Sequence, residues 1–152
     1  MTTAIEYGYI EPVEVHFDDL DAMGVVHNSR YAVLFERALA SYWARRGWAF
    51  DPKQPHFEQI FFVVREFSIR YRRPITGVGP VHLHFWIDEL GTNNIDYRFR
   101  VVSADGATVH AEGRRAQVKV DPRTLRPAPI SDDVREACRA LLVPDVRDLI
   151  AS

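Results

Sequence analysis

One stretch of helical periodicity, followed by a long series of strand-like segments, most constrains how this chain can fold. In region 28–47 the apolar residues recur at the spacing of a single helix face. They are Tyr31, Leu34, Phe35, Ala38 and Tyr42. Asn28 is predicted to cap this helix and Gly47 to stop it, which gives about four to five turns. Because the apolar stripe is broad and aromatic, we expect a sheet to cover it.

Strand-like segments lie on both sides of this helix in the sequence. The first alternates Val13, Val15 and Phe17 with polar residues, and the second runs from Ile60 to Tyr71. Two more alternate through residues 81–87 and 95–101. Their predicted core residues are Val81, Leu83, Phe85, Ile87, Ile95, Tyr97, Phe99 and Val101. Turn-forming residues at 91–93 and 105–106 predict that these neighbours form antiparallel hairpins.

The last long strand changes the parity of its apolar residues. The apolar positions from Val109 to Gly113 are odd-numbered, whereas those from Ala116 to Val120 are even-numbered. A β-bulge at residues 113–115 would reconcile the two sets.

A short helix is predicted after the strands, starting at Ser131 and limited by Pro144. The order is therefore one strand, one long helix, four strands and a tail helix, which predicts an α+β fold with a curved, mostly antiparallel sheet around the long helix. We see no repeat or second domain, so we expect a single domain over residues 1–152.

Composition narrows the class of protein. The 152 residues carry a formal net charge of -2, which does not indicate a nucleic-acid surface. No apolar run approaches the ~20 residues of a membrane helix, and the N-terminus lacks a signal-peptide pattern. Cys138 is the one cysteine, so no intrachain disulfide is possible. We therefore expect a cytoplasmic protein without nucleic-acid or membrane partners.

The segment before the long helix carries a recognisable motif. Its residues are Asp19, Asp21, Gly24, Val25, Val26 and Tyr31, in the order Asp-x-Asp-x-x-Gly-Val-Val-x-x-x-x-Tyr. This pattern resembles the signature of hot-dog-fold acyl-CoA thioesterases of the 4-hydroxybenzoyl-CoA thioesterase family. The Arg73-Pro74 end of the second strand and the pair Gly113-Arg114 are also similar to that family. The resemblance extends over about the whole chain and implies the hot-dog fold.

The resemblance implies an acyl-CoA thioesterase in which Asp21 is the catalytic carboxylate. Asp21 would either attack the thioester carbonyl or activate water as a general base, and the sequence does not choose between them. The backbone amide of Asn28 corresponds to the family's oxyanion donor, which suits the free N–H groups and positive dipole of a helix start. Gly24 belongs to the same loop and permits a tight turn or close ligand approach.

Other residues are assigned to substrate binding or to structure. His27, Tyr31 and Val26 are expected to line the acyl site, although each has a plain packing role as an alternative. Arg72 and Arg73 are candidates for the phosphates of coenzyme A. The loop carboxylate of Asp19 is expected to hold the loop by hydrogen bonds.

No metal site is predicted. His82 and His84 lie two residues apart on one strand face, but no third ligand has a helpful spacing. No separate cofactor is expected, because coenzyme A is part of the substrate.

Two features leave their roles open. The aromatic residues of the middle region form either core, a subunit interface or a pocket for a bulky acyl group. They are Trp43, Trp48, Phe50, Phe57, Phe61 and Phe62. Family members pair sheets edge to edge and form sites between subunits, so the resemblance implies a homodimer or homotetramer.

Three functions compete on this fold. The first is hydrolysis of an acyl-CoA, the second is hydrolysis of an acyl-carrier-protein thioester, and the third is binding of an acyl thioester without catalysis. Hydratases on related folds use Asp-x-x-x-x-His, and the spacing from Asp21 to His27 does not fit that arrangement.

Overall fold

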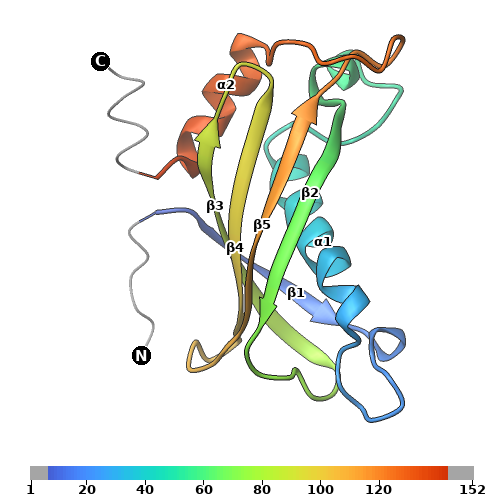
Figure 1. Cartoon of the computed structure of the whole chain (residues 1–152), viewed down its shortest axis with the longest axis vertical. Helices are drawn as coiled ribbons and strands as arrows, with labels where there is room; N and C mark the ends of the chain where they lie inside the picture. The colour runs from blue at the N-terminus through green and yellow to red at the C-terminus, as the bar shows by residue number, and fades with distance from the viewer. Residues whose placement is uncertain (1–6, 144–152) are drawn as a thin grey trace.

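The computed structural model describes residues 7–143. Five antiparallel strands form one sheet in the order β1-β3-β4-β5-β2, and the long helix α1 lies along one face of it (Figure 1). The strands are β1 (Tyr9–Val15), β2 (Phe62–Tyr71), β3 (Gly79–Leu90), β4 (Asn94–Ser103) and β5 (Val109–Lys119). The helices are α1 (Tyr31–Arg45) and α2 (Asp132–Cys138), with short 3-10 turns η1 (Phe17–Asp19), η2 (Asn28–Arg30), η3 (Phe57–Ile60) and η4 (Arg139–Leu141). This is the predicted hot-dog arrangement.

The core lies between α1 and the sheet, as the periodicity predicts. All five residues of the predicted helix stripe are buried, and so are the eight predicted core residues of β3 and β4. Phe35 of α1 stacks on Phe99 of β4 with ring centroids 4.5 Å apart, and Tyr42 meets Phe85 of β3 edge-on at 5.4 Å. Aromatic pairs of this kind stabilise the packing of the helix on the sheet beyond the area that they bury.

The start of the helix differs from the prediction by one residue and the end agrees with it. The residue before the first helical turn is His27, not Asn28, and its imidazole accepts a hydrogen bond from the Ser29 amide at 3.1 Å. Asn28 is therefore the first residue of a 3-10 turn that leads into α1. At the other end Gly47 has φ +85°, a left-handed conformation that glycine adopts without steric cost.

The prediction that Phe17 belongs to the first strand is wrong. Strand β1 ends at Val15, and Phe17 lies in η1 with 84% of its surface exposed. The Asp19 carboxylate accepts a hydrogen bond from the His16 amide at 2.8 Å and so turns the chain away from the sheet. Strand β2 also starts two residues later than expected, at Phe62.

The predicted bulge at residues 113–115 is also wrong, because β5 pairs without interruption there with both β4 and β2. Odd-numbered residues keep facing α1, so the polar side chains of Arg115 and Gln117 lie on the helix side of the sheet. A Cβ on Gly113 would lie 2.4 Å from the Ser68 carbonyl oxygen and 2.7 Å from the Phe99 ring. Glycine is therefore needed where that ring crosses the strand.

The predicted strand directions and the predicted start of the short helix agree with the structure. Neighbouring strands are antiparallel throughout, and β2 forms one edge of the sheet. The Ser131 hydroxyl caps α2 by accepting a hydrogen bond from the Val134 amide at 3.3 Å. The proposed limit of this helix at Pro144 lies outside the described residues. Among residues 7–143 no helix has the length and apolar character needed to cross a membrane.

Candidate functional site

The loop between β1 and α1 is a closed turn that holds Asp21. Its two arms are joined by a bridge between Leu20 and Val26 and by a hydrogen bond from the Asp21 amide to the Val25 carbonyl at 2.8 Å. Gly24 sits at the turn with φ +79°, and its carbonyl accepts a hydrogen bond from the Gly77 amide at 3.0 Å. The Gly24 amide donates to the Asp21 carbonyl at 3.0 Å. Of the two roles predicted for Gly24, a tight turn and close ligand approach, these contacts support the tight turn.

One oxygen of the Asp21 carboxylate is fixed by its own loop. Oδ1 accepts hydrogen bonds from the amides of Met23 at 2.8 Å and Val25 at 3.3 Å. Oδ2 receives no hydrogen bond from any residue between 7 and 143. The side chain is half-buried. Asp21 therefore has the turn-forming contacts typical of aspartate and also a second carboxylate oxygen free for chemistry.

The buried carboxylate of Asp19 holds the loop in place. Its fully buried carboxylate accepts hydrogen bonds from Arg30 Nε at 2.9 Å and Arg37 Nη1 at 3.0 Å, besides the one from the His16 amide. Burial alone would raise the pKa of this carboxyl, but these hydrogen bonds and the Arg37 charge lower it to about 2. The Asp19 carbonyl also accepts from the His27 amide at 2.9 Å. Asp19 thus ties the Asp21 loop to both the start and the first turns of α1, which agrees with the structural role expected from the sequence.

The start of the helix presents a free donor next to this loop. The Asn28 N–H makes no hydrogen bond within the described part of the chain, while the Asn28 carbonyl accepts from the Tyr71 hydroxyl at 3.0 Å. The Tyr71 ring also packs edge-on against Tyr31 at 5.1 Å. Sequence reasoning did not assign Tyr71, the last residue of β2, to the site. Its inward parity in β2 is the signal that could have done so.

The remaining predicted site residues fall into two groups. His27, Tyr31 and Val26 lie at the loop and helix start; Val26 is buried and its amide bonds the Ile75 carbonyl at 2.9 Å. Because the His27 Nδ1 accepts from the Ser29 amide, the neutral ring carries its proton on Nε2. Arg72 forms the second group. Its Nε donates a hydrogen bond to the Glu112 carboxylate at 3.1 Å, and Glu112 lies on the sheet face away from α1.

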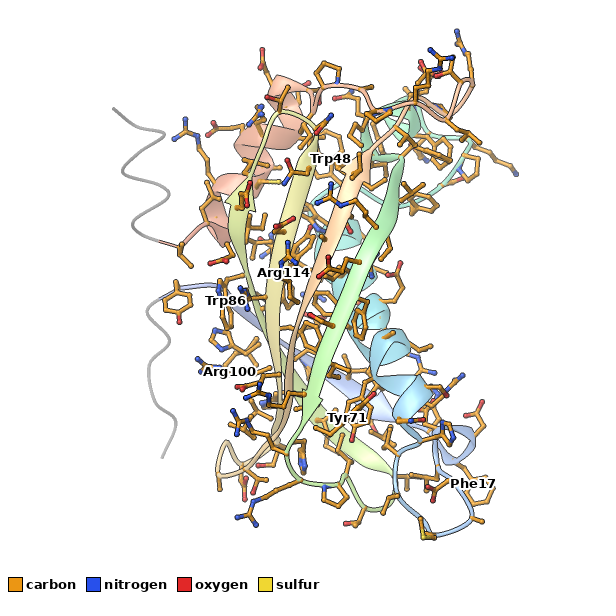
Figure 2. The ribbon with its side chains drawn as sticks, in the orientation of Figure 1. Phe17, Trp48, Tyr71, Trp86, Arg100 and Arg114 are labelled. Atoms are coloured by element: carbon orange, nitrogen blue, oxygen red, sulfur yellow. The ribbon has the colours of Figure 1, made fainter. Side chains whose placement is uncertain are left out.

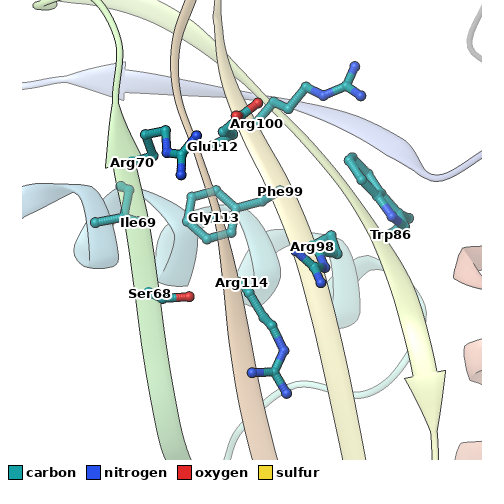
Figure 3. A pocket seen from close by; sticks show the side chains of 10 residues that line it. All are labelled: Ser68, Ile69, Arg70, Trp86, Arg98, Phe99, Arg100, Glu112, Gly113 and Arg114. Atoms are coloured by element: carbon teal, nitrogen blue, oxygen red, sulfur yellow. The ribbon is translucent and has the colours of Figure 1, made fainter.

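A broad groove of about 450 Å³ lies on the sheet face away from α1 (Figure 3). Its charged lining comes from β2, β4 and β5, namely Arg70, Arg98, Arg100, Glu112 and Arg114. Arg100 lies over the Trp86 ring, 5.3 Å from its centroid. Acidic partners neutralise much of this charge, since Arg114 pairs with Asp96 at 2.7 Å and Arg98 with Asp88 at 3.3 Å. The groove does not contain Asp21 or any other residue of its loop.

A smaller cavity of about 170 Å³ lies between α1 and the sheet. Its aromatic lining is Trp43, Trp48, Phe50, Phe62 and Tyr97, and its polar lining includes Glu36, Arg115 and Gln117. Four of the six aromatic residues left open by the sequence therefore line a pocket. Figure 2 places Trp48 near the opposite end of the sheet from Phe17 and Tyr71.

Histidines and acids with metal-like spacing already have other contacts. His84 is buried against Trp86, and its Nε2 lies 3.1 Å from the Tyr7 carbonyl oxygen. Within residues 7–143, His16, Asp18 and Asp19 form a cluster whose ligand atoms lie within 4.8 Å of one another. Both Asp19 oxygens are occupied by the arginines and the His16 amide.

Comparisons with known proteins agree with the motif. A sequence model of the thioesterase-like superfamily matches residues 15–138. The acyl-CoA thioester hydrolase YbgC of Escherichia coli O6:H1 is 28% identical over 116 residues, which cover 76% of this chain and 84% of that protein. The acyl-CoA thioesterase YbgC of Haemophilus influenzae is 34% identical over 67 residues, or 44% of this chain and 48% of that protein.

Solved structures give the same fold. A Thermus thermophilus thioesterase crystallised with coenzyme A and Zn has a TM-score of 0.72 and 29% identity, with 90% of this chain and 97% of that chain covered. The PA5185 protein from Pseudomonas aeruginosa has a TM-score of 0.79 and 25% identity over 91% of this chain and 94% of that chain.

Proposed function

The chain belongs to the thioesterase-like superfamily, and on that basis we propose that it hydrolyses acyl-CoA thioesters to the free acid and coenzyme A. The observation that carries this proposal is the pairing of a loop carboxylate with a free helix-start amide. Asp21 is fixed through one oxygen only, and the neighbouring Asn28 N–H has no partner within the described residues. The relatives named as acyl-CoA thioester hydrolases support the choice of substrate class.

Asp21 and the Asn28 N–H would have separate roles in hydrolysis. The thioester carbonyl would lie with its oxygen toward the Asn28 N–H, where the helix dipole favours developing negative charge. The free Asp21 oxygen would attack the carbonyl carbon to give a mixed anhydride that water then hydrolyses, or it would take a proton from a water that attacks the carbonyl directly. In both cases coenzyme A would leave as the thiolate and the acyl group would be released as the free acid. His27, Tyr31 and Val26 would line the acyl entrance, and Arg73 would meet phosphate groups of coenzyme A. This reaction needs no separate cofactor.

Replacing Asn28 with proline is expected to lower kcat about 10²–10³-fold, because the oxyanion would lose its N–H donor. Proline suits this position, since the first residue of a helical turn needs no N–H and the preceding His27 already has an extended backbone (φ -64°, ψ 141°). Thermal unfolding and kcat for the best acyl-CoA substrate should both be measured. Asn28→Ala, which keeps the N–H, is the control. An unchanged kcat in the proline variant would remove Asn28 from the mechanism.

An acyl-carrier-protein thioester is the second candidate substrate, and a non-catalytic acyl-thioester binder is the third. Comparing kcat/KM for the same acyl group on coenzyme A and on a carrier protein separates the first two. Binding without release of thiol would identify the third.

We further propose that two copies pair through β2. No other strand pairs with the outer side of β2 within residues 7–143, and its exposed residues include Val63 (43%) and Val64 (51%). The unpaired N–H and C=O groups of such an edge favour pairing with a second strand. Next to it, a shallow apolar groove runs between α1 and β2, lined by residues such as Ala32, Val33 and Val64. A two-fold pairing would make the two β2 strands antiparallel and bring the two helices side by side.

The substitution Val64→Lys is expected to shift the protein from dimer or tetramer toward monomer, because each contact would bury two charges. Val78→Lys is the matched control, since Val78 is also an exposed valine (63%) but lies outside β2. Light scattering coupled to gel filtration measures the mass. A monomeric parent protein would contradict the proposal.

A further inference from the structure

The cavity between α1 and the sheet has the size of one small ring. Its volume of about 170 Å³ is close to the ~150 Å³ of an engineered protein cavity that binds benzene. Indole and phenyl rings from α1, from the loop after it and from β2 form most of its wall, together with Ile95 of β4. A cavity of this kind suits a compact apolar body.

The cavity also contains polar groups whose hydrogen bonds are incomplete. Gln117 is 7% exposed and lines the cavity, and its side-chain amide, which is not fully enclosed, has no hydrogen-bond partner within residues 7–143. Arg115 Nε is buried and unpaired in the same range. A buried donor without a partner is rare and costly, and an unpaired amide that lines a cavity is available to a ligand, so the two groups together point to a ligand that supplies the missing contacts.

The charges in the cavity specify what kind of polar group would fit. The Arg115 guanidinium is already paired through Nη1 with the Glu36 carboxylate, so its charge is balanced. Gln117 offers an amide N–H and a carbonyl but no charge. A neutral oxygen, such as a ketone, is therefore a better partner here than a carboxylate, which would face Glu36.

The proposed pairing through β2 places this cavity near the partner's Asp21 loop. Phe62, at the start of β2, lines the cavity, and Tyr71, at its end, bonds the Asn28 carbonyl. Within one chain the two ends are far apart along the strand (Figure 2), but antiparallel pairing sets the start of one β2 beside the end of the other. The cavity mouth contains Glu36 and the exposed Phe50.

We propose that this cavity receives the acyl group of the thioester bound at the partner's Asp21 and selects a ring-sized acyl body that carries a neutral oxygen acceptor. Gln117 is the specificity-determining residue. This inference rests on the proposed thioesterase function and on pairing through β2.

The first test uses the free ring bodies, so that binding is read without catalysis. Cyclohexanone and methylenecyclohexane differ only by oxygen against a methylene group. Protein labelled with ¹⁵N-tryptophan reports their binding through the indole signals of Trp43 and Trp48 in the cavity, and Trp86 on the opposite sheet face is an internal reference. We expect the parent to bind cyclohexanone about tenfold more tightly, and Gln117→Leu to lose that preference. Gln54→Leu, at an exposed loop residue, is the control.

The second test uses the matching thioesters, (4-oxocyclohexyl)acetyl-CoA and (4-methylidenecyclohexyl)acetyl-CoA. The expected result is a kcat/KM preference for the oxo compound of about tenfold in the parent and none in Gln117→Leu. Equal kcat/KM values in the parent, or a preference that survives in Gln117→Leu, would overturn the inference while leaving the hydrolysis itself in place. If other acyl-CoAs are cleaved and neither ring compound is, the inference also fails. If no thioester is cleaved but cyclohexanone still shifts Trp43, the proposed function fails and the cavity is a binding site only.

Discussion

Replacing Asp19 with asparagine is expected to lower the free energy of unfolding by about 2–4 kcal/mol. The carboxylate is fully buried and bound by two guanidinium groups and one amide, so the neutral side chain would leave Arg30 and Arg37 without their counter-charge. Both arginines keep about 30% of their side-chain surface in solvent, which limits the loss. For a domain of this size the change corresponds to a fall of roughly 5–12 °C in Tm, measured by thermal unfolding at pH 7.

The pH dependence gives this prediction a second readout. The pKa of Asp19 is lowered from 3.8 to about 2 on folding, so its contribution to stability is present above pH 3.8 and is lost as the pH falls through 2. The difference in stability between the parent and Asp19→Asn should therefore shrink between these two values. Asp18→Asn, at the exposed neighbouring residue, is the control. A difference that stays constant down to pH 2 would contradict the ionised state of Asp19.

Replacing Asp21 with asparagine is expected to abolish most turnover. If Asp21 is the general base, kcat should fall about 10²–10⁴-fold, and if it is the nucleophile the loss should be at least as large. The variant should still fold, because the amide oxygen can accept the same hydrogen bonds from Met23 and Val25. Steady-state kcat on the best acyl-CoA, together with the thermal unfolding midpoint, checks both halves of the prediction. Asp18→Asn again serves as the control.

Local periodicity was sufficient to predict the core. The stripe on α1 and the alternation in β3 and β4 depend on side-chain direction within one element, and the structure buries all of those residues. The motif around Asp21 was recognised by its resemblance to a known family, because its residues lie close together in the sequence. Its chemical roles remain predictions.

Two of the errors depend in part on contacts between residues far apart in the sequence. Phe17 continues the alternation of β1, but the hydrogen bonds of Asp19 to the His16 amide and to the arginines of η2 and α1 bend the chain out of the sheet. In β5 the change of apolar parity predicted a bulge, but the strand stays regular at residues 113–115 and the polar residues Arg115 and Gln117 lie on its helix side. They face α1 because Glu36 and the cavity accommodate them, which no local pattern specifies.

The central claim is that Asp21 carries out acyl-CoA hydrolysis. The most direct test measures release of free thiol from a panel of acyl-CoAs, from short aliphatic to aromatic, by the parent protein and by Asp21→Asn. We predict that the parent cleaves at least one member of the panel and that the folded variant loses nearly all of that activity. A parent that cleaves no acyl-CoA, or a variant as active as the parent, would contradict the claim.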